Sequence, residues 1–194
     1  LNAEKARAGT LLTALGRPLA QSYTGLLDLK LDAQGALIPD QPLHRQVQAQ
    51  LTASLSESNL LLSGFWENQL LKPLAALLRV PELTRTPIDA ASLELSLQDG
   101  VARIVDATVQ SAIATFHTQG AAALADRLLD TPLSLPIEAK IDRDLLKRAG
   151  LEWLERQAPE GIATLAQLPQ FIQIAGLLGN PQASLNSENL LNLA

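Results

Sequence analysis

The side chains best suited to chemistry are two histidines and a few serines, and they stand far apart in the chain. His44 lies in a loop bounded by prolines, and His117 has no Asp, Glu or Cys at the spacing of metal ligands. Ser58, Ser63 and Ser111 lack the G-x-S-x-G context that exposes a nucleophilic serine on a sharp turn. We therefore expect surface or hydrogen-bonded side chains here, and neither a metal site nor an acyl-transfer centre.

The acidic residues alternate with apolar residues instead of clustering. Asp28, Asp32 and Glu94 each lie between two apolar neighbours, so solvation on the polar side of a strand explains them better than acid–base catalysis. Gly176 and Gly179 are not followed by the Lys-Ser/Thr pair of a phosphate-binding loop, and the chain has no Cys. The sequence predicts no catalytic residue, no cofactor and no metal, and therefore a protein that is not an enzyme.

The amino-acid composition of the chain bears on whether it binds nucleic acid. With 194 residues, 47% of them hydrophobic, the chain can bury a substantial core. Its 15 Lys and Arg residues are scattered, its formal net charge is −5 and only 3% of its residues are aromatic. A nucleic-acid site needs clustered positive charge and often stacking aromatic rings. We therefore expect no nucleic-acid partner.

Strict alternation of apolar and polar residues indicates β-strands as the elements that position these side chains. Strands are predicted at 25–34, 46–55, 60–62, 91–98, 101–104, 106–119, 132–141 and 171–175. Asp99 and Gly100 separate two of them and tolerate the positive φ angles of a type I′ turn, which predicts a hairpin. The first two strands are expected to pair antiparallel.

Helical spacing of apolar residues is confined to short stretches. Helices are predicted at 3–15, 67–79, 142–157 and 188–193. Pro73 should kink the second helix or mark its first turn, and Asp142 or Asp144 should cap the third, which would bury Trp153. Strands dominate and helices lie between groups of them, so the predicted class is α+β with a mostly antiparallel sheet.

The apolar positions of the alternating strands form stripes that either fill a core or face a ligand. The candidate core or lipid-facing residues are Leu27, Leu29, Leu31, Leu93, Leu95, Leu97, Leu133, Leu135 and Ile137. An aliphatic stripe can pack against acyl chains as well as against a protein core. In either case, the free energy is lowered by about 25 cal/mol for each Å² of apolar area removed from water.

Two motifs resemble the C-terminal region of the AsmA family. The first is S-L-E-L-S-L-Q-D-G-V-A-R-I at 92–104, followed by a strand, Gly120, L-A at 124–125, L-D at 129–130 and P-L-S-L-P-I at 132–137. The second is I-A-G-L-L-G-N-P-Q-A-S at 174–184, which is similar to the family's closing I-x-G-x-L-x-N-P-x-x-S. Both occur in the family's order. The chain departs from the pattern at 139–141, and 142–168 is interpreted as a possible helical insertion.

The resemblance implies a periplasmic protein of a Gram-negative envelope, anchored in the inner membrane by an N-terminal segment that is missing here. Members are linked to outer-membrane biogenesis and phospholipid transport, and relatives form a curved sheet with an apolar concave face. The chain begins at Leu1 and contains no Met, so we expect residues 1–194 to be a single domain cut from a longer protein. Helices are then expected on or beside that curved sheet.

Three functions follow. The first is a segment that offers an apolar sheet face or groove to phospholipid or another acyl lipid, wherever the helices at 67–79 and 144–157 leave the sheet uncovered. The second is a structural or protein-interaction module that binds other envelope proteins and has a self-filled core. The third and weakest is an enzyme, for which the sequence supplies no converging polar residues.

Overall fold

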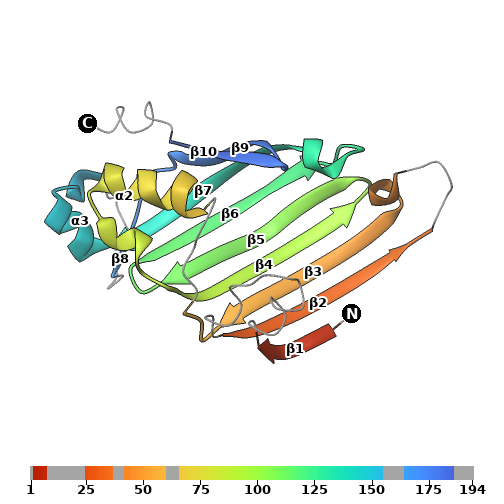
Figure 1. Ribbon diagram of the computed structural model, residues 1–194, viewed down its shortest axis with the longest axis horizontal. Helices are drawn as coiled ribbons and strands as arrows, with labels where there is room; N and C mark the ends of the chain where they lie inside the picture. The colour runs from red at the N-terminus through yellow and green to blue at the C-terminus, as the bar shows by residue number, and fades with distance from the viewer. Residues whose placement is uncertain (1, 8–24, 37–41, 60–65, 155–163, 186–194) are drawn as a thin grey trace.

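A computed structural model describes residues 2–7, 25–36, 42–59, 66–154 and 164–185 (Figure 1). Their strands form one ten-stranded sheet in which every pairing is antiparallel. The strands are β1 (Asn2–Arg7), β2 (Leu26–Gly35), β3 (Val47–Ser56), β4 (Ile88–Gln98), β5 (Val101–Ser111), β6 (Ala114–Ala123), β7 (Pro132–Asp142), β8 (Leu165–Gln167), β9 (Ile172–Leu177) and β10 (Asn180–Leu185).

The strand order follows the chain almost without exception. β1 to β7 lie side by side in sequence order, β9 and β10 continue the sheet, and β8 pairs with one end of β7. Helical segments are few: η2 (Leu43–Arg45), η3 (Trp66–Leu71), α2 (Lys72–Leu78), η4 (Pro81–Thr84), η5 (Leu128–Asp130), α3 (Arg143–Ala149) and η6 (Glu152–Leu154). The predicted α+β class with a mostly antiparallel sheet is confirmed, with fewer helices than predicted.

The central hairpin forms as predicted. Asp99 has φ of 51° and Gly100 has φ of 74°, so both turn residues adopt the left-handed conformation that a type I′ turn requires. β4 and β5 run from this turn with Gln98 opposite Val101 and Leu97 opposite Ala102. β2 and β3 also pair antiparallel, as predicted.

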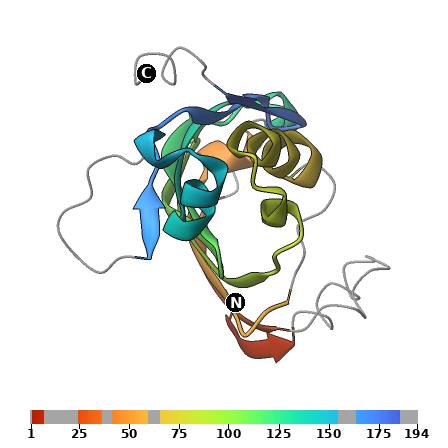
Figure 2. The same ribbon diagram turned by 90° about the vertical axis from the view of Figure 1, so that its left-hand side faces the viewer.

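The core lies between α2, α3 and the C-terminal half of the sheet. Leu74 and Leu78 of α2 and Leu146 of α3 are buried in one cluster with Ile141 of β7 and Ile172 of β9. Figure 2 shows the sheet curving around the side on which α2 and η4 lie. The helices therefore cover the concave side of the sheet, at the end where β7 leads into α3 (Figure 1).

The helix predicted at 67–79 is confirmed, with a modified start. Trp66–Leu71 forms a π-helical segment, α2 follows it directly, and Pro73 lies in the first turn of α2. Arg79 ends the helix with φ of 53°. Leu77 points away from the core and is 40% exposed.

The helix predicted at 3–15 is wrong over 3–7, which belong to β1 (Asn2–Arg7), and 8–15 lie outside the described residues. β1 pairs with β2 from Asn2 opposite Lys30 to Arg7 opposite Leu26. The edge of β2 supplies inter-strand hydrogen bonds that a short, marginally stable helix cannot match. Tertiary pairing thus overrides local propensity here.

The single long strand predicted at 106–119 is also wrong. The chain turns at 112–113 and divides this stretch between β5 and β6. The Ser111 hydroxyl donates to the Ala114 carbonyl and accepts from the Ala114 N–H, both at 3.1 Å. No Gly or Pro marks this turn, so the alternation of polarity concealed it.

The helix predicted at 142–157 is shorter in the structure. Asp142, one of the two predicted capping residues, caps α3 by accepting from the Leu145 N–H at 3.1 Å. Gly150, with φ of 69°, ends the helix in a left-handed cap. Trp153 therefore lies beyond the helix in η6 and is 49% exposed, so its predicted burial is wrong.

The remaining differences concern short elements. β9 extends to Leu177, beyond the strand predicted at 171–175, and a return strand that was not predicted, β10, begins at Asn180. Within 142–168, β8 pairs with β7, and Ala166 and Leu168 join the core. The strand predicted at 60–62 and the helix predicted at 188–193 fall outside the described residues.

Candidate functional site

Strand register places the candidate apolar residues on one face of the sheet. Residues directly opposite each other in an antiparallel pair project to the same side. One such row runs across the sheet through Leu29, Ala53, Leu93, Ala107, Thr118, Ile137 and Ile172. We call the face that carries this row the concave face, because α2 packs on it and the sheet curves around it (Figure 2).

Neighbouring rows extend the same face. The row toward the hairpin turn contains Leu31, Leu51, Leu95, Ile104 and Gly120, and the next contains Ala33, Ala49, Leu97, Ala102 and Ala122. On the other side lies the row Leu27, Leu55, Ala91, Val109, Phe116 and Ala139. A bulge at Val105 and Asp106 of β5 keeps Ile104 and Ala107 both on this face. Leu93, Leu95 and Leu97 thus share a side with Leu135 and Ile137, as the alternation predicts.

The structure divides the concave face into a covered part and an open part. On β7, Leu135 is 9% exposed and Ile137 3% exposed; both belong to the core beneath the helices, and Leu133 packs against it. The other six candidates are half-buried, and none of them belongs to the core cluster of described residues: Leu27, Leu29, Leu31, Leu93, Leu95 and Leu97. The aliphatic surface of β2–β4 therefore extends beyond the cover that α2 and α3 provide.

The side chains on the open part of the concave face differ in size from one row to the next. The row through Leu31, Leu51 and Leu95 carries a bulky side chain on each of three adjacent strands. The row beside it has alanine on β2 and β3, with Leu97 following on β4. Since alanine projects only a methyl group, the face is shallower toward the hairpin turn. The surface offers dispersion contacts and no hydrogen-bond donors, so its chemistry suits an aliphatic chain.

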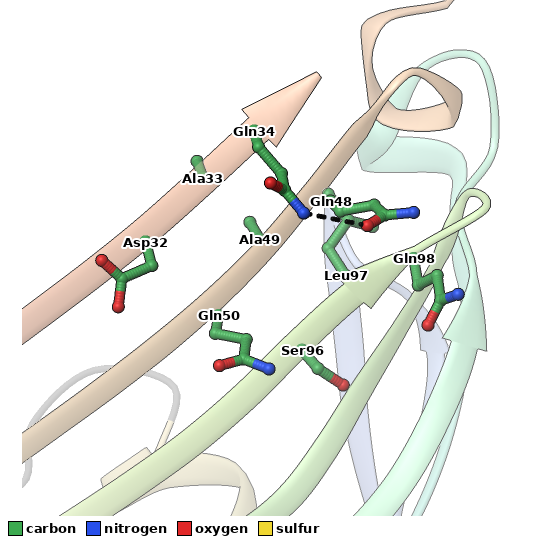
Figure 3. A pocket seen from close by; sticks show the side chains of 9 residues that line it. All are labelled: Asp32, Ala33, Gln34, Gln48, Ala49, Gln50, Ser96, Leu97 and Gln98. Carbon is green, nitrogen blue, oxygen red and sulfur yellow. Dashed lines mark hydrogen bonds between the residues drawn. The ribbon is translucent and has the colours of Figure 1, made fainter.

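The opposite, convex face is polar. A hollow of about 380 Å³ lies over β2–β4 on this face and is lined by Asp32, Gln34, Gln48, Gln50, Ser96 and Gln98 (Figure 3). Ala33, Ala49 and Leu97, whose side chains the register places on the concave face, also border it. Gln34 donates to Gln48 across the strands at 3.3 Å, and the exposed Asp32 carboxylate lies 3.3 Å from the Lys30 ammonium. Asp28 and Glu94 project to this same convex side, opposite Ser54 and Thr52 respectively. Amides and solvated ion pairs of this kind bind water and supply no nucleophile.

His117 has acidic neighbours that its position in the sequence did not indicate. Its Nε2 lies 3.0 Å from Asp106 Oδ1, and its Nδ1 lies 3.7 Å from Glu138 Oε2. Thr108 also donates to Asp106 at 3.3 Å. These contacts arise because His117 lies opposite Thr108 on β5 and opposite Glu138 on β7. Recognising the turn at 112–113 would have revealed the β5 pairing in advance.

The His117 cluster orients an imidazole without completing a reactive centre. A hollow of about 370 Å³ beside it is lined by Thr108, Gln110, Thr115, His117, Glu138 and Lys140. In the part of the chain that the structure describes, no group of three His, Cys, Asp or Glu side chains is arranged to hold a metal ion. The contacts join β5, β6 and β7 on the convex face, so they support a structural role for His117.

The other residues considered for chemistry have packing or turn roles. His44 is 9% exposed and its Nε2 has no hydrogen-bond partner; it packs beside the hairpin turn, where a Cβ on Gly100 would lie 3.5 Å from its Cδ2. Ser111 closes the β5–β6 turn. The Ser58 backbone N–H donates to the Asp89 carbonyl at 3.1 Å, and Ser63 lies outside the described residues.

The fold and the face define a curved antiparallel sheet with a one-sided helical cover and an aliphatic concave surface. No family model matches the chain, and comparison with curated proteins and with solved structures gives no match. The AsmA resemblance therefore stays a prediction. Among the described residues, no helix combines the length and the apolar character that crossing a bilayer requires.

Proposed function

We propose that this chain is a non-enzymatic, lipid-handling segment of an envelope protein, and that the open part of the concave face binds the acyl chain of a phospholipid or similar lipid. The observation that carries the proposal is the half-buried leucine surface of β2–β4, which lies outside the core cluster of described residues. Extended aliphatic surface of this kind is characteristic of an interaction site in a folded protein.

The physical reason is the match between the surface and the ligand. An acyl chain has no hydrogen-bonding groups, so it loses nothing on contact with side chains that offer none. The contact surface comes from Leu29, Leu31, Leu93 and Leu95. Each Å² of apolar area that binding removes from water contributes about 25 cal/mol to the binding free energy. Leu29 and Leu93 each face Ala53 on β3, which leaves space between two bulky side chains.

The AsmA resemblance supports a cellular setting for this activity. It favours the periplasm of a Gram-negative envelope, as part of a protein anchored in the inner membrane and engaged in outer-membrane biogenesis or phospholipid transport. The partners in that setting are phospholipid and other envelope proteins. The absence of Cys is compatible with an oxidising compartment.

Native mass spectrometry of the purified chain, before and after delipidation, tests the proposal. We expect the protein to carry phospholipid after purification, to lose it on delipidation and to regain it when lipid is added back. A chain that carries no lipid before delipidation and takes up none afterwards contradicts lipid binding.

The alternative is a structural or protein-interaction module, and one observation favours it. Where α2 and η4 meet the sheet, the core is nearly filled: a void of only about 20 Å³ lies among Leu71, Leu83, Ile88, Val109 and Phe116, with Thr86, Ser111 and Ala114 completing its lining. A protein whose whole concave face were filled in this way would bind no lipid. The lipid-free outcome of the mass spectrometry is the result that this alternative expects.

A further inference from the structure

Four leucines are exposed together at one corner of the sheet, which we call the leucine tip. Leu128 and Leu129 of η5 are 50% and 61% exposed, and Leu177 and Leu178 of the β9–β10 hairpin are 45% and 44% exposed. Pro132, at the start of β7, lies opposite Leu177, so the two segments are neighbours. In Figure 1 this corner lies at the end of the sheet away from α2 and α3.

Backbone hydrogen bonds hold the leucine tip in a fixed arrangement. The Leu178 N–H donates to the Thr131 carbonyl and the Gly179 N–H donates to the Leu129 carbonyl, each at 2.8 Å. A Cβ on Gly179 would lie 3.0 Å from the Leu129 Cβ, so this close approach of the two segments requires glycine. These bonds fix the backbone of the two segments relative to each other, and in this arrangement the four leucine side chains are in contact with water.

The charges beside the leucine tip are paired within the chain. Arg45 lies 3.2 Å from Asp126, and Arg127 lies 3.6 Å from Asp130. Each ion pair combines one positive and one negative group, so the tip as a whole is apolar and close to neutral. An acidic or basic partner would find little net charge to complement, whereas a zwitterionic lipid surface needs none.

The leucine tip lies at the same end of the sheet as the β4–β5 turn. The Leu124 N–H donates to the Gly100 carbonyl at 2.8 Å, which ties the segment leading into η5 to the β4–β5 turn. Leu97 and Ala102, the last concave-face pair before that turn, belong to the shallow alanine-rich row. A bilayer in contact with the tip would therefore meet the end of the sheet at which the shallow row lies.

We propose that the leucine tip docks this protein on a phospholipid bilayer, with Leu128, Leu129, Leu177 and Leu178 inserted among the headgroups and upper acyl chains. This inference rests on the proposed lipid-binding function, to which it adds the place where lipid passes between bilayer and protein. Insertion is shallow, since the leucines belong to two tight turns and not to a helix, and it is driven by apolar area.

Flotation with phosphatidylcholine vesicles tests the docking. The tip variant is Leu128→Ser, Leu129→Ser, Leu177→Ser and Leu178→Ser combined; the matched control is Leu77→Ser with Trp153→Ser, which removes exposed apolar side chains at the helical end. We expect the tip variant to lose vesicle binding at least about tenfold and the control to bind as the unchanged chain does. Because the tip is neutral, raising the salt from about 50 to about 500 mM should not weaken the binding.

Three results would overturn the docking: no flotation of the unchanged chain, equal flotation of the tip variant, or a dimer in solution that dissociates in the tip variant. The last would assign the leucines to contact with a second copy of the chain. Circular dichroism establishes that each variant is folded.

A monomeric fluorescent fatty acid, used without vesicles, separates this inference from the proposed function. We expect the tip variant to bind it normally, and Leu29→Glu to float with vesicles while failing to bind it. If the unchanged chain binds the fatty acid but does not float with vesicles, the docking is contradicted and the concave-face site stands. If the unchanged chain does not bind the fatty acid, the concave-face site is contradicted.

Discussion

Gly120 of β6 lies directly beneath Leu135 of β7: a Cβ placed on Gly120 would be 2.6 Å from the Leu135 Cδ2. Leu135 is 9% exposed and belongs to the core cluster, so it has little room to move. The glycine thus sets how closely the concave-face side chain of β7 can approach β6.

Gly120→Ala should lower the free energy of unfolding by about 1–3 kcal/mol, because the added methyl group forces Leu135 out of its place. Urea denaturation measures the change. Leu135→Val shortens the opposing side chain. The loss of unfolding free energy in the double variant should therefore be smaller than the losses in the two single variants added together. Strict additivity would show that the two residues do not interact.

A charged side chain placed on the concave face should lower the free energy of unfolding more where the helices cover that face than where they leave it open. Ile137→Asp buries an unpaired carboxylate at a position that is 3% exposed, and should destabilise by about 4 kcal/mol or more. Leu95→Asp should cost about half as much, since Leu95 is only half-buried. Glu94→Gln, on the convex side of the same strand, should be nearly silent. Equal costs for Ile137→Asp and Leu95→Asp in urea denaturation would contradict the division of the face.

Leu29→Glu should abolish lipid binding and leave the fold intact, because it introduces a carboxylate where the acyl chain is proposed to lie. Thr52→Glu is the matched control: it adds the same charge on β3, but on the convex side, between Lys30 and Glu94. Native mass spectrometry of lipid-loaded protein measures the difference. Equal lipid occupancy in the two variants would place the lipid elsewhere.

The cap of α3 is open to a direct test. Asp142→Ala removes the acceptor of the Leu145 N–H and should cost about 1 kcal/mol of unfolding free energy. Asp142→Asn keeps an acceptor oxygen and should cost clearly less. If both variants lose the same amount in urea denaturation, the side-chain hydrogen bond does not stabilise the helix.

Some features could be predicted from particular residues because they depend on near neighbours. Asp99 and Gly100 indicate a turn wherever they stand between alternating strands, and Pro73 can lie in a helix only near its start. Asp142 and Asp144 likewise indicated a helix start in this region, and the structure assigns the cap to Asp142. Local signals failed at Ser111, whose side-chain hydrogen bonds build a turn without Gly or Pro, and at Asn2–Arg7, where pairing with β2 outweighs helix propensity.

By itself the sequence determined that the chain forms strands and which side chains share a face, because the period of two that separates Leu93 from Leu95 is a property of the extended backbone. Only the tertiary structure decided that Ile137 is covered while Leu29 stays half-exposed, because α2 and α3 pack over one end of the sheet. It likewise brought Asp106 and Glu138 to His117, and Gly179 to Leu129. These contacts join residues from separate strands and turns, and no spacing along the chain specifies which distant segments will meet.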